Sequence, residues 1–205
     1  MKAAVIHNFG GANQLAIEDV AVPKPADGEV LIDVHASGIN PIDFKTRNGM
    51  GVSRGWDRVP ENIILGWDIS GVVVESQSDT WRVGDAVFGM PRFPALTDGY
   101  AEFVTAPGNE LARKPDGISH LEAAGVPLAA LTAWQALFDN AGLENGQQVL
   151  IHAGAGGVGH FDYSGVSGYQ TGYSGLFIAG GYAYYAPFGS SSAQQGVLMR
   201  VSTTT

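Results

Sequence analysis

A glycine-rich stretch in the second half of the chain contains the residues best suited to a chemical task. An apolar run, 149–151, leads into a loop of small residues. The loop consists of Gly154, Ala155, Gly156, Gly157, Val158 and Gly159. This order is typical of a strand, a tight turn and a helix start, where backbone N–H groups can approach a pyrophosphate. Because glycines also form ordinary turns, the loop predicts dinucleotide binding only if a helix, a second strand and a ribose-binding acid follow.

The sequence after the loop does not supply these elements. Gly165 and Gly168 interrupt any helix within two turns, each at a cost of about 1 kcal/mol relative to alanine. No charged residue lies between Asp162 and Arg200, so an acid for a ribose hydroxyl and a base for a 2′-phosphate are both missing. Residues 162–205 are instead rich in Gly, Ser and Tyr, and their apolar runs around a Gly-Gly pair predict a β-hairpin.

Composition indicates a globular protein, because 45% of the 205 residues are hydrophobic and only 15% are charged. The net charge of −9 argues against non-specific binding to nucleic acid and against attraction to anionic membranes. No apolar run approaches the roughly 20 residues of a membrane-spanning helix. The first residues also lack the pattern of a signal peptide. We therefore expect a cytoplasmic protein with neither nucleic acid nor membrane as a partner.

Several kinds of catalytic and metal site are disfavoured by the residues present. The chain has no cysteine, which excludes disulfides, thiolate ligands and a cysteine nucleophile. Its five histidines show no spacing typical of metal ligands. No Gly-x-Ser-x-Gly sequence, which would carry a nucleophilic serine, occurs. We expect no metal site and no serine-hydrolase activity.

The elements before the glycine loop are predicted to be mostly short strands, together with a few helices. Asn40 followed by Pro41 predicts an N-cap and the first residue of a helix that runs to about Arg47. Ser119 and Glu122 have the spacing of a capping box at the start of another helix. A third helix, 127–142, has an apolar face that we expect in the core. Strands are predicted over 2–6, 15–20, 29–37, 63–75, 86–88, 99–105 and 110–113.

Six stretches, in this order, make the chain resemble the medium-chain dehydrogenase/reductase superfamily, in its zinc-independent quinone oxidoreductase branch. They are residues 37–43, 65–73, 83–89, 99–104, 131–137 and the glycine loop. The resemblance covers residues 1–161 and implies an α+β, mostly β protein. Its parts would be a GroES-like β-barrel domain (1–118), the beginning of a Rossmann domain (119–161) and an unrelated Gly/Ser/Tyr-rich tail (162–205).

The resemblance also implies a reaction, which is hydride transfer from NADPH to a quinone or an α,β-unsaturated carbonyl. Zinc-containing relatives place a cysteine ligand near residues 37–43, so the absence of cysteine agrees with the zinc-free branch. Positions near the nicotinamide in such enzymes match Asn40, Asp43, Arg47 and Thr132. We expect Asn40 and Asp43 to be catalytic, and Thr132 and residues 154–159 to bind NADP.

Each of these residues also has a structural interpretation. Asn40 and Asp43 could cap their helix and compensate its dipole. The Thr132 hydroxyl could bond to a carbonyl of its own helix, and the glycine loop could be only a turn. The whole chain has an alternative too, as an inactive truncated or fused relative that acts as a structural or self-associating protein. Cofactor binding would separate the enzyme from this alternative, and a homo-oligomer is compatible with both.

Overall fold

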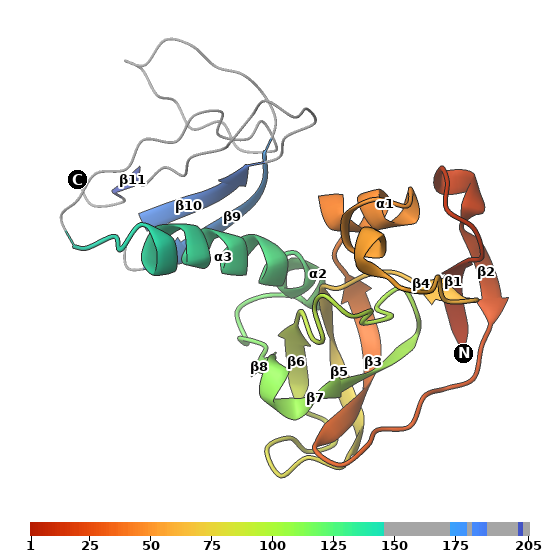
Figure 1. Cartoon of the computed structure of the whole chain (residues 1–205). Coiled ribbons are helices and arrows are strands. Elements are labelled where there is room, and N and C mark those ends of the chain that lie inside the picture. Colours follow the sequence, from red (N-terminus) through yellow and green to blue (C-terminus); the bar gives the residue numbers. More distant parts are fainter. Residues whose placement is uncertain (146–172, 180–181, 188–200, 203–205) are drawn as a thin grey trace. The chain divides into compact units, whose positions relative to one another are not determined.

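The computed structural model describes residues 1–145, 173–179, 182–187 and 201–202 (Figure 1). The chain forms two units, Met1–Pro127 and Leu128–Thr205. The described part is mostly β with few helices, as the sequence predicts. No helix in this part is long and apolar enough to cross a membrane. The predicted domain boundaries at 118 and 161 stay predictions.

A five-stranded antiparallel sheet is the frame of the first unit, in the order β7-β3-β5-β6-β8. Its strands are β3 (Glu29–Ser37), β5 (Ile69–Ser76), β6 (Ala86–Gly89), β7 (Phe103–Pro107) and β8 (Leu111–Arg113). Strand β3 has the predicted bounds and pairs with both β5 and β7. The sheet contributes most of one hydrophobic core, which contains Val30, Ile32, Ile69, Val73, Trp81, Val87, Val104 and Ala106. Each large side chain buried there contributes roughly 1.5–3 kcal/mol.

A second, three-stranded sheet has the order β2-β1-β4. Its strands are β1 (Lys2–Ile6), β2 (Ala16–Asp19) and β4 (Ile63–Ile64). The prediction of one bent strand over 63–75 is wrong, because β4 pairs with β1 whereas β5 pairs with β3 in the other sheet. Gly66 lies between them with a φ of +91°, a conformation that favours glycine. The glycine signals the bend, but not that the chain changes sheets there.

Residues 65–68, which connect the two sheets, also explain why β7 begins later than the predicted strand 99–105. Gly99 N–H donates to Gly66 O at 2.9 Å and Tyr100 N–H donates to Leu65 O at 2.8 Å. These residues therefore bond to the connecting segment before the chain enters β7 at Phe103. Trp67, in the same segment, is fully buried, and its indole N–H donates to Ala95 O at 2.7 Å.

Short helices connect the strands of the first unit. Helix α1 (Pro41–Arg47) has the predicted bounds, and α2 (His120–Ala124) has the predicted capping box. One-turn 3₁₀ helices are η1 (Ala12–Gln14), η2 (Gly51–Gly55) and η3 (Gly108–Glu110). Helix α2 packs against β3, β5 and β6, so it belongs with the first unit.

A hydrogen bond fixes the beginning of α2 to the sheet. His120 Nδ1 lies 2.8 Å from the hydroxyl of Ser70, which is fully buried and donates its own proton to Val87 O at 3.1 Å. The imidazole is therefore assigned as the donor to Ser70. Burial, and then the nearby His35 and Lys114, lower the pKa of His120 below its usual value. The ring is consequently neutral at physiological pH.

The second unit begins one residue into α3 (Pro127–Trp134), which continues as the π-helical turn η4 (Gln135–Asn140). The helix ends before Gly142, whose φ is +58°. The prediction that its apolar face is core holds for Leu137, which is 2% exposed, but Leu131 and Trp134 are 45% and 51% exposed. Strands β9 (Tyr173–Ala179) and β10 (Tyr182–Pro187) pair antiparallel, as the predicted hairpin requires, and β11 (Val201–Ser202) pairs with β10. The hairpin turn and residues 147–159 lie outside the described residues.

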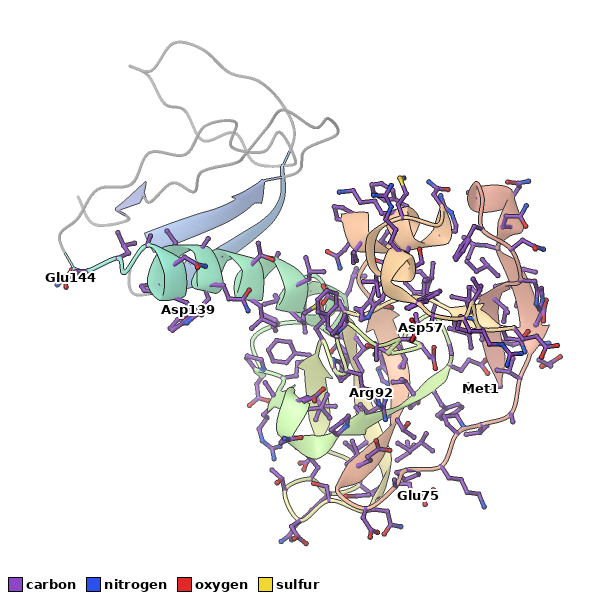
Figure 2. All side chains as sticks on the ribbon, in the orientation of Figure 1. Met1, Asp57, Glu75, Arg92, Asp139 and Glu144 are labelled. Carbon is purple, nitrogen blue, oxygen red and sulfur yellow. The ribbon has the colours of Figure 1, made fainter. Side chains whose placement is uncertain are left out.

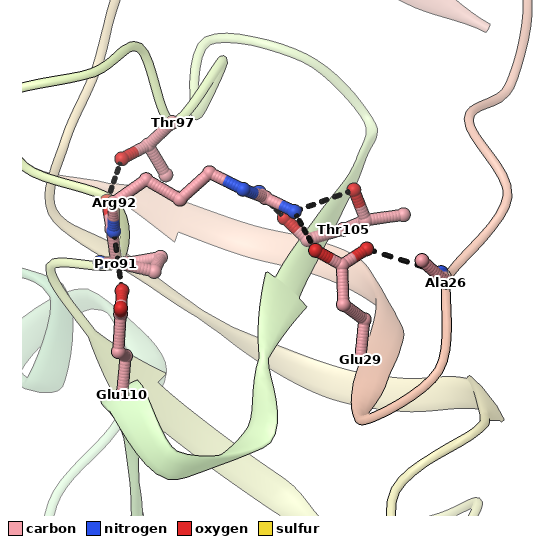
Figure 3. A network of polar contacts seen from close by, with 7 residues as sticks. All are labelled: Ala26, Glu29, Pro91, Arg92, Thr97, Thr105 and Glu110. Atoms are coloured by element: carbon pink, nitrogen blue, oxygen red, sulfur yellow. Dashed lines mark hydrogen bonds and ion pairs between the residues drawn. The ribbon is translucent and has the colours of Figure 1, made fainter.

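Arg92 anchors the loop 90–99, which precedes Tyr100, to the five-stranded sheet (Figures 2 and 3). Its guanidinium donates to Glu29 Oε1 at 2.6 Å, to Thr105 Oγ1 at 3.1 Å and to the carbonyl oxygen of Thr105. Its backbone N–H donates to Glu110 Oε2 at 2.5 Å. The Arg92 and Glu29 side chains are only 25% and 21% exposed. The network therefore ties the loop to β3, β7 and the segment before β8.

Removing this guanidinium should destabilise the first unit. We expect Arg92→Met to lower the free energy of unfolding by about 2 kcal/mol at neutral pH, because Glu29 and Thr105 lose their donor. Methionine keeps the Cβ, so the strain of the +63° φ at this position is the same in both proteins. Urea unfolding measures the difference. Lys2→Met is the control, because the ion pair of Lys2 with Asp19 is exposed and should contribute less than about 1 kcal/mol.

The effect of Arg92→Met should also depend on pH. Burial opposes ionisation of Glu29, but the hydrogen bonds from Ala26 N–H and Arg92 outweigh it and lower the pKa of Glu29. A lowered pKa stabilises the folded state above the unfolded pKa, and this stabilisation is lost as pH falls through the folded pKa. The difference between the two proteins should therefore shrink below about pH 4.3. A difference unchanged from pH 7 to pH 3 would contradict this assignment.

Candidate functional site

Hydrogen bonds join the segment between β3 and α1 to Asp68. Ser37 Oγ donates to Asp68 O at 2.9 Å, and Gly38 N–H donates to the same oxygen at 2.9 Å. A Cβ on Gly38 would lie 2.4 Å from the carbonyl oxygen of Ala124, in α2, and 2.9 Å from Asp68 Cβ. Only glycine fits there. The backbone at Gly38, which leads into α1, therefore packs closely between α2 and Asp68.

Asn40 and Asp43 form the N-terminal cap of α1. Asn40 N–H donates to Asp43 Oδ2 at 2.7 Å, and Gly66 N–H donates to Asp43 Oδ1 at 3.0 Å. Asp43 is 1% exposed, so its carboxylate joins the helix to the segment between the two sheets. Burial raises the pKa of Asp43, although the two N–H donors act in the opposite direction. The helix-capping interpretation of Asp43 is thus confirmed.

The side chain of Asn40 has a different partner. Its Nδ2 donates to Asp68 Oδ2 at 2.9 Å, and Asp68 is itself 1% exposed. Asn40 is therefore held by one buried carboxylate at its main chain and by another at its carboxamide. Asn40 is only half-buried, and the preceding Ile39 is 81% exposed. Of the three polar residues Asn40, Asp43 and Asp68, only Asn40 can meet a ligand from solution.

Tyr100 completes the surroundings of Asp43. A Cβ on Gly66 would lie 2.4 Å from Tyr100 Cδ1, so the phenol ring packs directly on the glycine backbone. Burial, and then the negative charge of Asp43, raise the pKa of Tyr100 above its usual value. Its hydroxyl is therefore neutral, lies beside the Asp43 carboxylate, and is buried without a hydrogen bond of standard geometry to the described residues.

Asn40, Asp43, Asp68 and Tyr100 form one polar cluster. The other predicted site residues are not part of it. Arg47 donates from Nε to Gly10 O at 3.2 Å, which connects α1 to the turn before β2. Thr132 lies on α3, in the second unit, and is exposed. The loop 154–159 lies outside the described residues, so its predicted role stays a prediction. Within the described part of the chain, no three His, Asp or Glu side chains gather in a way that could hold a metal ion.

Comparison with known proteins identifies the family. The model of the alcohol dehydrogenase GroES-like domain matches residues 26–116. Human quinone oxidoreductase is 33% identical over 163 residues, which are 78% of this chain and 47% of that protein. The 2-methylene-furan-3-one reductase of Solanum lycopersicum is 38% identical over 168 residues, 78% of this chain and 42% of that enzyme. The structure of the quinone oxidoreductase from Coxiella burnetii superposes with a TM-score of 0.69 and 43% identity, over 78% of this chain and 51% of that one.

This chain belongs to the medium-chain dehydrogenase/reductase superfamily. It spans 47% of the length of human quinone oxidoreductase and 42% of the length of the 2-methylene-furan-3-one reductase. Its first unit contains the match to the GroES-like domain, residues 26–116, which confirms the predicted fold class.

Two residues of the cluster, Asp68 and Tyr100, were not among the predicted site residues. Both lie in stretches that carry the resemblance to the superfamily, 65–73 and 99–104. For Asp68 the sequence did offer a signal, because it is an acidic residue inside an otherwise apolar segment. Charged residues are almost never fully buried without a partner, so this pattern indicates a partner elsewhere in the chain. The partner, Asn40, is 28 positions away, so local sequence could not name it.

Proposed function

We propose that the chain carries the substrate-binding part of a zinc-free NAD(P)H-dependent oxidoreductase that reduces a quinone or an α,β-unsaturated carbonyl by hydride transfer. The observation that carries the proposal is the half-buried Asn40 beside the exposed Ile39, with its carboxamide held by the buried Asp68 and its main-chain N–H held by the buried Asp43. Quinones and enones combine an apolar carbon skeleton with a carbonyl oxygen, which suits an apolar side chain beside a fixed N–H donor. The relatives named quinone oxidoreductase and 2-methylene-furan-3-one reductase support this substrate class.

NADPH is the cofactor that we propose, because a solved mycobacterial relative is described as complexed with NADPH. Thr132 and residues 154–159 are the proposed contacts. The exposed position of Thr132 on α3 fits a ribose or phosphate contact. When bound, the cofactor would supply the hydride. The complete absence of cysteine from the chain supports a reaction without zinc.

The residues of the first unit would act by positioning and by electrostatics. A carbonyl that accepts a hydride at carbon gains negative charge on oxygen, and a fixed N–H donor stabilises that charge. Asn40 provides such a donor. The carboxyl group of Asp43 is enclosed, with both oxygens bonded to backbone N–H groups. We therefore propose that Asp43 positions Asn40 and does not itself touch the reacting atoms.

Titration of NADPH by fluorescence, followed by addition of 1,4-benzoquinone or cyclohexenone, tests the proposed function. We expect acceptor-dependent oxidation of NADPH, and Asn40→Ala should lower kcat/KM about tenfold because one donor to the developing oxyanion is removed. Asn48→Ala is the matched control, since Asn48 is an exposed residue at the other end of α1 and should leave kcat/KM unchanged. Failure of the full chain to bind millimolar NADPH would overturn the proposal and favour the structural, self-associating alternative.

A further inference from the structure

We propose that Asp68 is a positioning residue for Asn40. In this proposal Asp68 sets the orientation of the Asn40 carboxamide, and with it the N–H that Asn40 presents to a ligand. The orientation follows from the hydrogen bond of 2.9 Å between Asn40 Nδ2 and Asp68 Oδ2. The use of that N–H toward a substrate carbonyl rests on the proposed function, whereas the orientation does not.

Asp68 is well suited to orient another side chain because it has little freedom itself. Its carbonyl oxygen accepts hydrogen bonds from Ser37 Oγ and Gly38 N–H, both at 2.9 Å. The position of an added Cβ on Gly38 lies 2.9 Å from Asp68 Cβ and 3.3 Å from its Oδ2, so the side chain is packed closely against the glycine. Asp68 is 1% exposed. Its carboxylate is therefore fixed relative to the start of α1.

The chemistry of the pair determines which end of the carboxamide faces Asp68. The amide nitrogen of Asn40 donates to Asp68 Oδ2, so the nitrogen end of the carboxamide faces the carboxyl group. The flipped carboxamide would place two acceptors against each other. The capping bond from Asn40 N–H to Asp43, at 2.7 Å, holds the main chain of the same residue.

This orientation specifies what Asn40 offers to a ligand. A carboxamide nitrogen carries two N–H bonds, and one of them is used by Asp68. Within the described part of the chain, the second N–H has no hydrogen-bond acceptor. A carbonyl oxygen is the complementary group, so Asp68 makes Asn40 a donor to an electron-accepting carbonyl. Without Asp68, the carboxamide could turn and present its oxygen, which would repel the same ligand.

Exchanging the side-chain types of Asn40 and Asp68 distinguishes the effect of carboxamide orientation from the effect of packing. Asp68→Asn leaves two amides, so neither orientation is enforced. Combining Asn40→Asp with Asp68→Asn restores one carboxylate and one amide, with the hydrogen bond running in the opposite direction. The packing and the total charge are then those of the natural pair, but position 40 now carries an acceptor and cannot donate to a carbonyl. Asp79→Asn, at an exposed position, is the control for loss of one negative charge.

Three measurements on the full chain give the outcome. In ¹⁵N–¹H NMR, one of the two Nδ2 protons of Asn40 should exchange with solvent at least tenfold more slowly than the other, and Asp68→Asn should abolish this difference. In NADPH-dependent quinone reduction, Asp68→Asn should lower kcat about tenfold with a smaller change in KM. The double exchange should recover the urea midpoint of the natural protein without recovering kcat.

Three outcomes would overturn the proposal. The first is equal exchange of both Nδ2 protons in the natural chain, a test that needs no variant to fold. The second is an unchanged exchange pattern in Asp68→Asn. The third is recovery of kcat together with stability in the double exchange, which would show that only packing matters. If the natural chain neither binds NADPH nor reduces a quinone, the proposed function fails, and the NMR and unfolding data still decide the role of Asp68.

Discussion

Gly38→Ala is expected to lower the free energy of unfolding by about 3 kcal/mol and to disturb the site at Asn40. The new Cβ would lie 2.4 Å from the carbonyl oxygen of Ala124 and 2.9 Å from Asp68 Cβ. Neither neighbour can retreat easily. Helix α2 is fixed to the sheet through His120 and the buried Ser70, and Asp68 O accepts two hydrogen bonds. The clash must therefore move α2 or the segment that carries Asn40.

Urea unfolding and the quinone assay together test this prediction. Gly117→Ala is the matched control, because a Cβ there would meet nothing within 4 Å and its φ is not in the left-handed region. The control should change stability by less than about 0.5 kcal/mol. We expect Gly38→Ala to reduce kcat/KM as well as stability, since Asp68, one of the two neighbours of the new Cβ, also positions Asn40. If the two alanine variants proved equally stable, the described packing of α2 against Gly38 would be wrong.

Features whose signals are contiguous in the sequence were predictable. Apart from Leu31, the sequence of strand β3 alternates between apolar and polar residues, and α1 has an N-cap, a proline at its first position and a glycine soon after its end. Both elements have the predicted bounds because hydrophobic periodicity and capping act within a few residues. The capping box of α2 was equally local. The role of Asp43 as a cap followed from the same signals.

Features that depend on distant residues were not predictable from one sequence. Gly66 marks a bend, but a strand signal cannot say that residues before and after it pair in different sheets. Asn40 and Asp68 meet across 28 positions, and Tyr100 reaches Asp43 only because its backbone pairs with Leu65. The candidate site is therefore a product of the sheet topology. The resemblance indicated the stretches that contribute to it, but not their hydrogen bonds.

Asp43→Ala should have the largest effect on stability of the changes considered, about 4 kcal/mol. The carboxylate is 1% exposed and accepts from Asn40 N–H at 2.7 Å and from Gly66 N–H at 3.0 Å. Alanine would leave the buried Gly66 N–H and the half-buried Asn40 N–H without an acceptor, at a cost of roughly 1–3 kcal/mol each. Lys45→Ala, at an exposed position of the same helix, should change the free energy of unfolding by less than about 0.5 kcal/mol.

The pH dependence of this effect should be opposite in sign to that of Arg92→Met. Burial raises the pKa of Asp43, so the folded state binds the proton more tightly than the unfolded chain does. The contribution of Asp43 to stability therefore falls as pH rises from the unfolded value, about 3.9, through the raised folded value. The difference between the natural protein and Asp43→Ala should be larger near pH 4 than at pH 7. A difference that grows with pH would mean that the two N–H donors outweigh burial at this carboxylate.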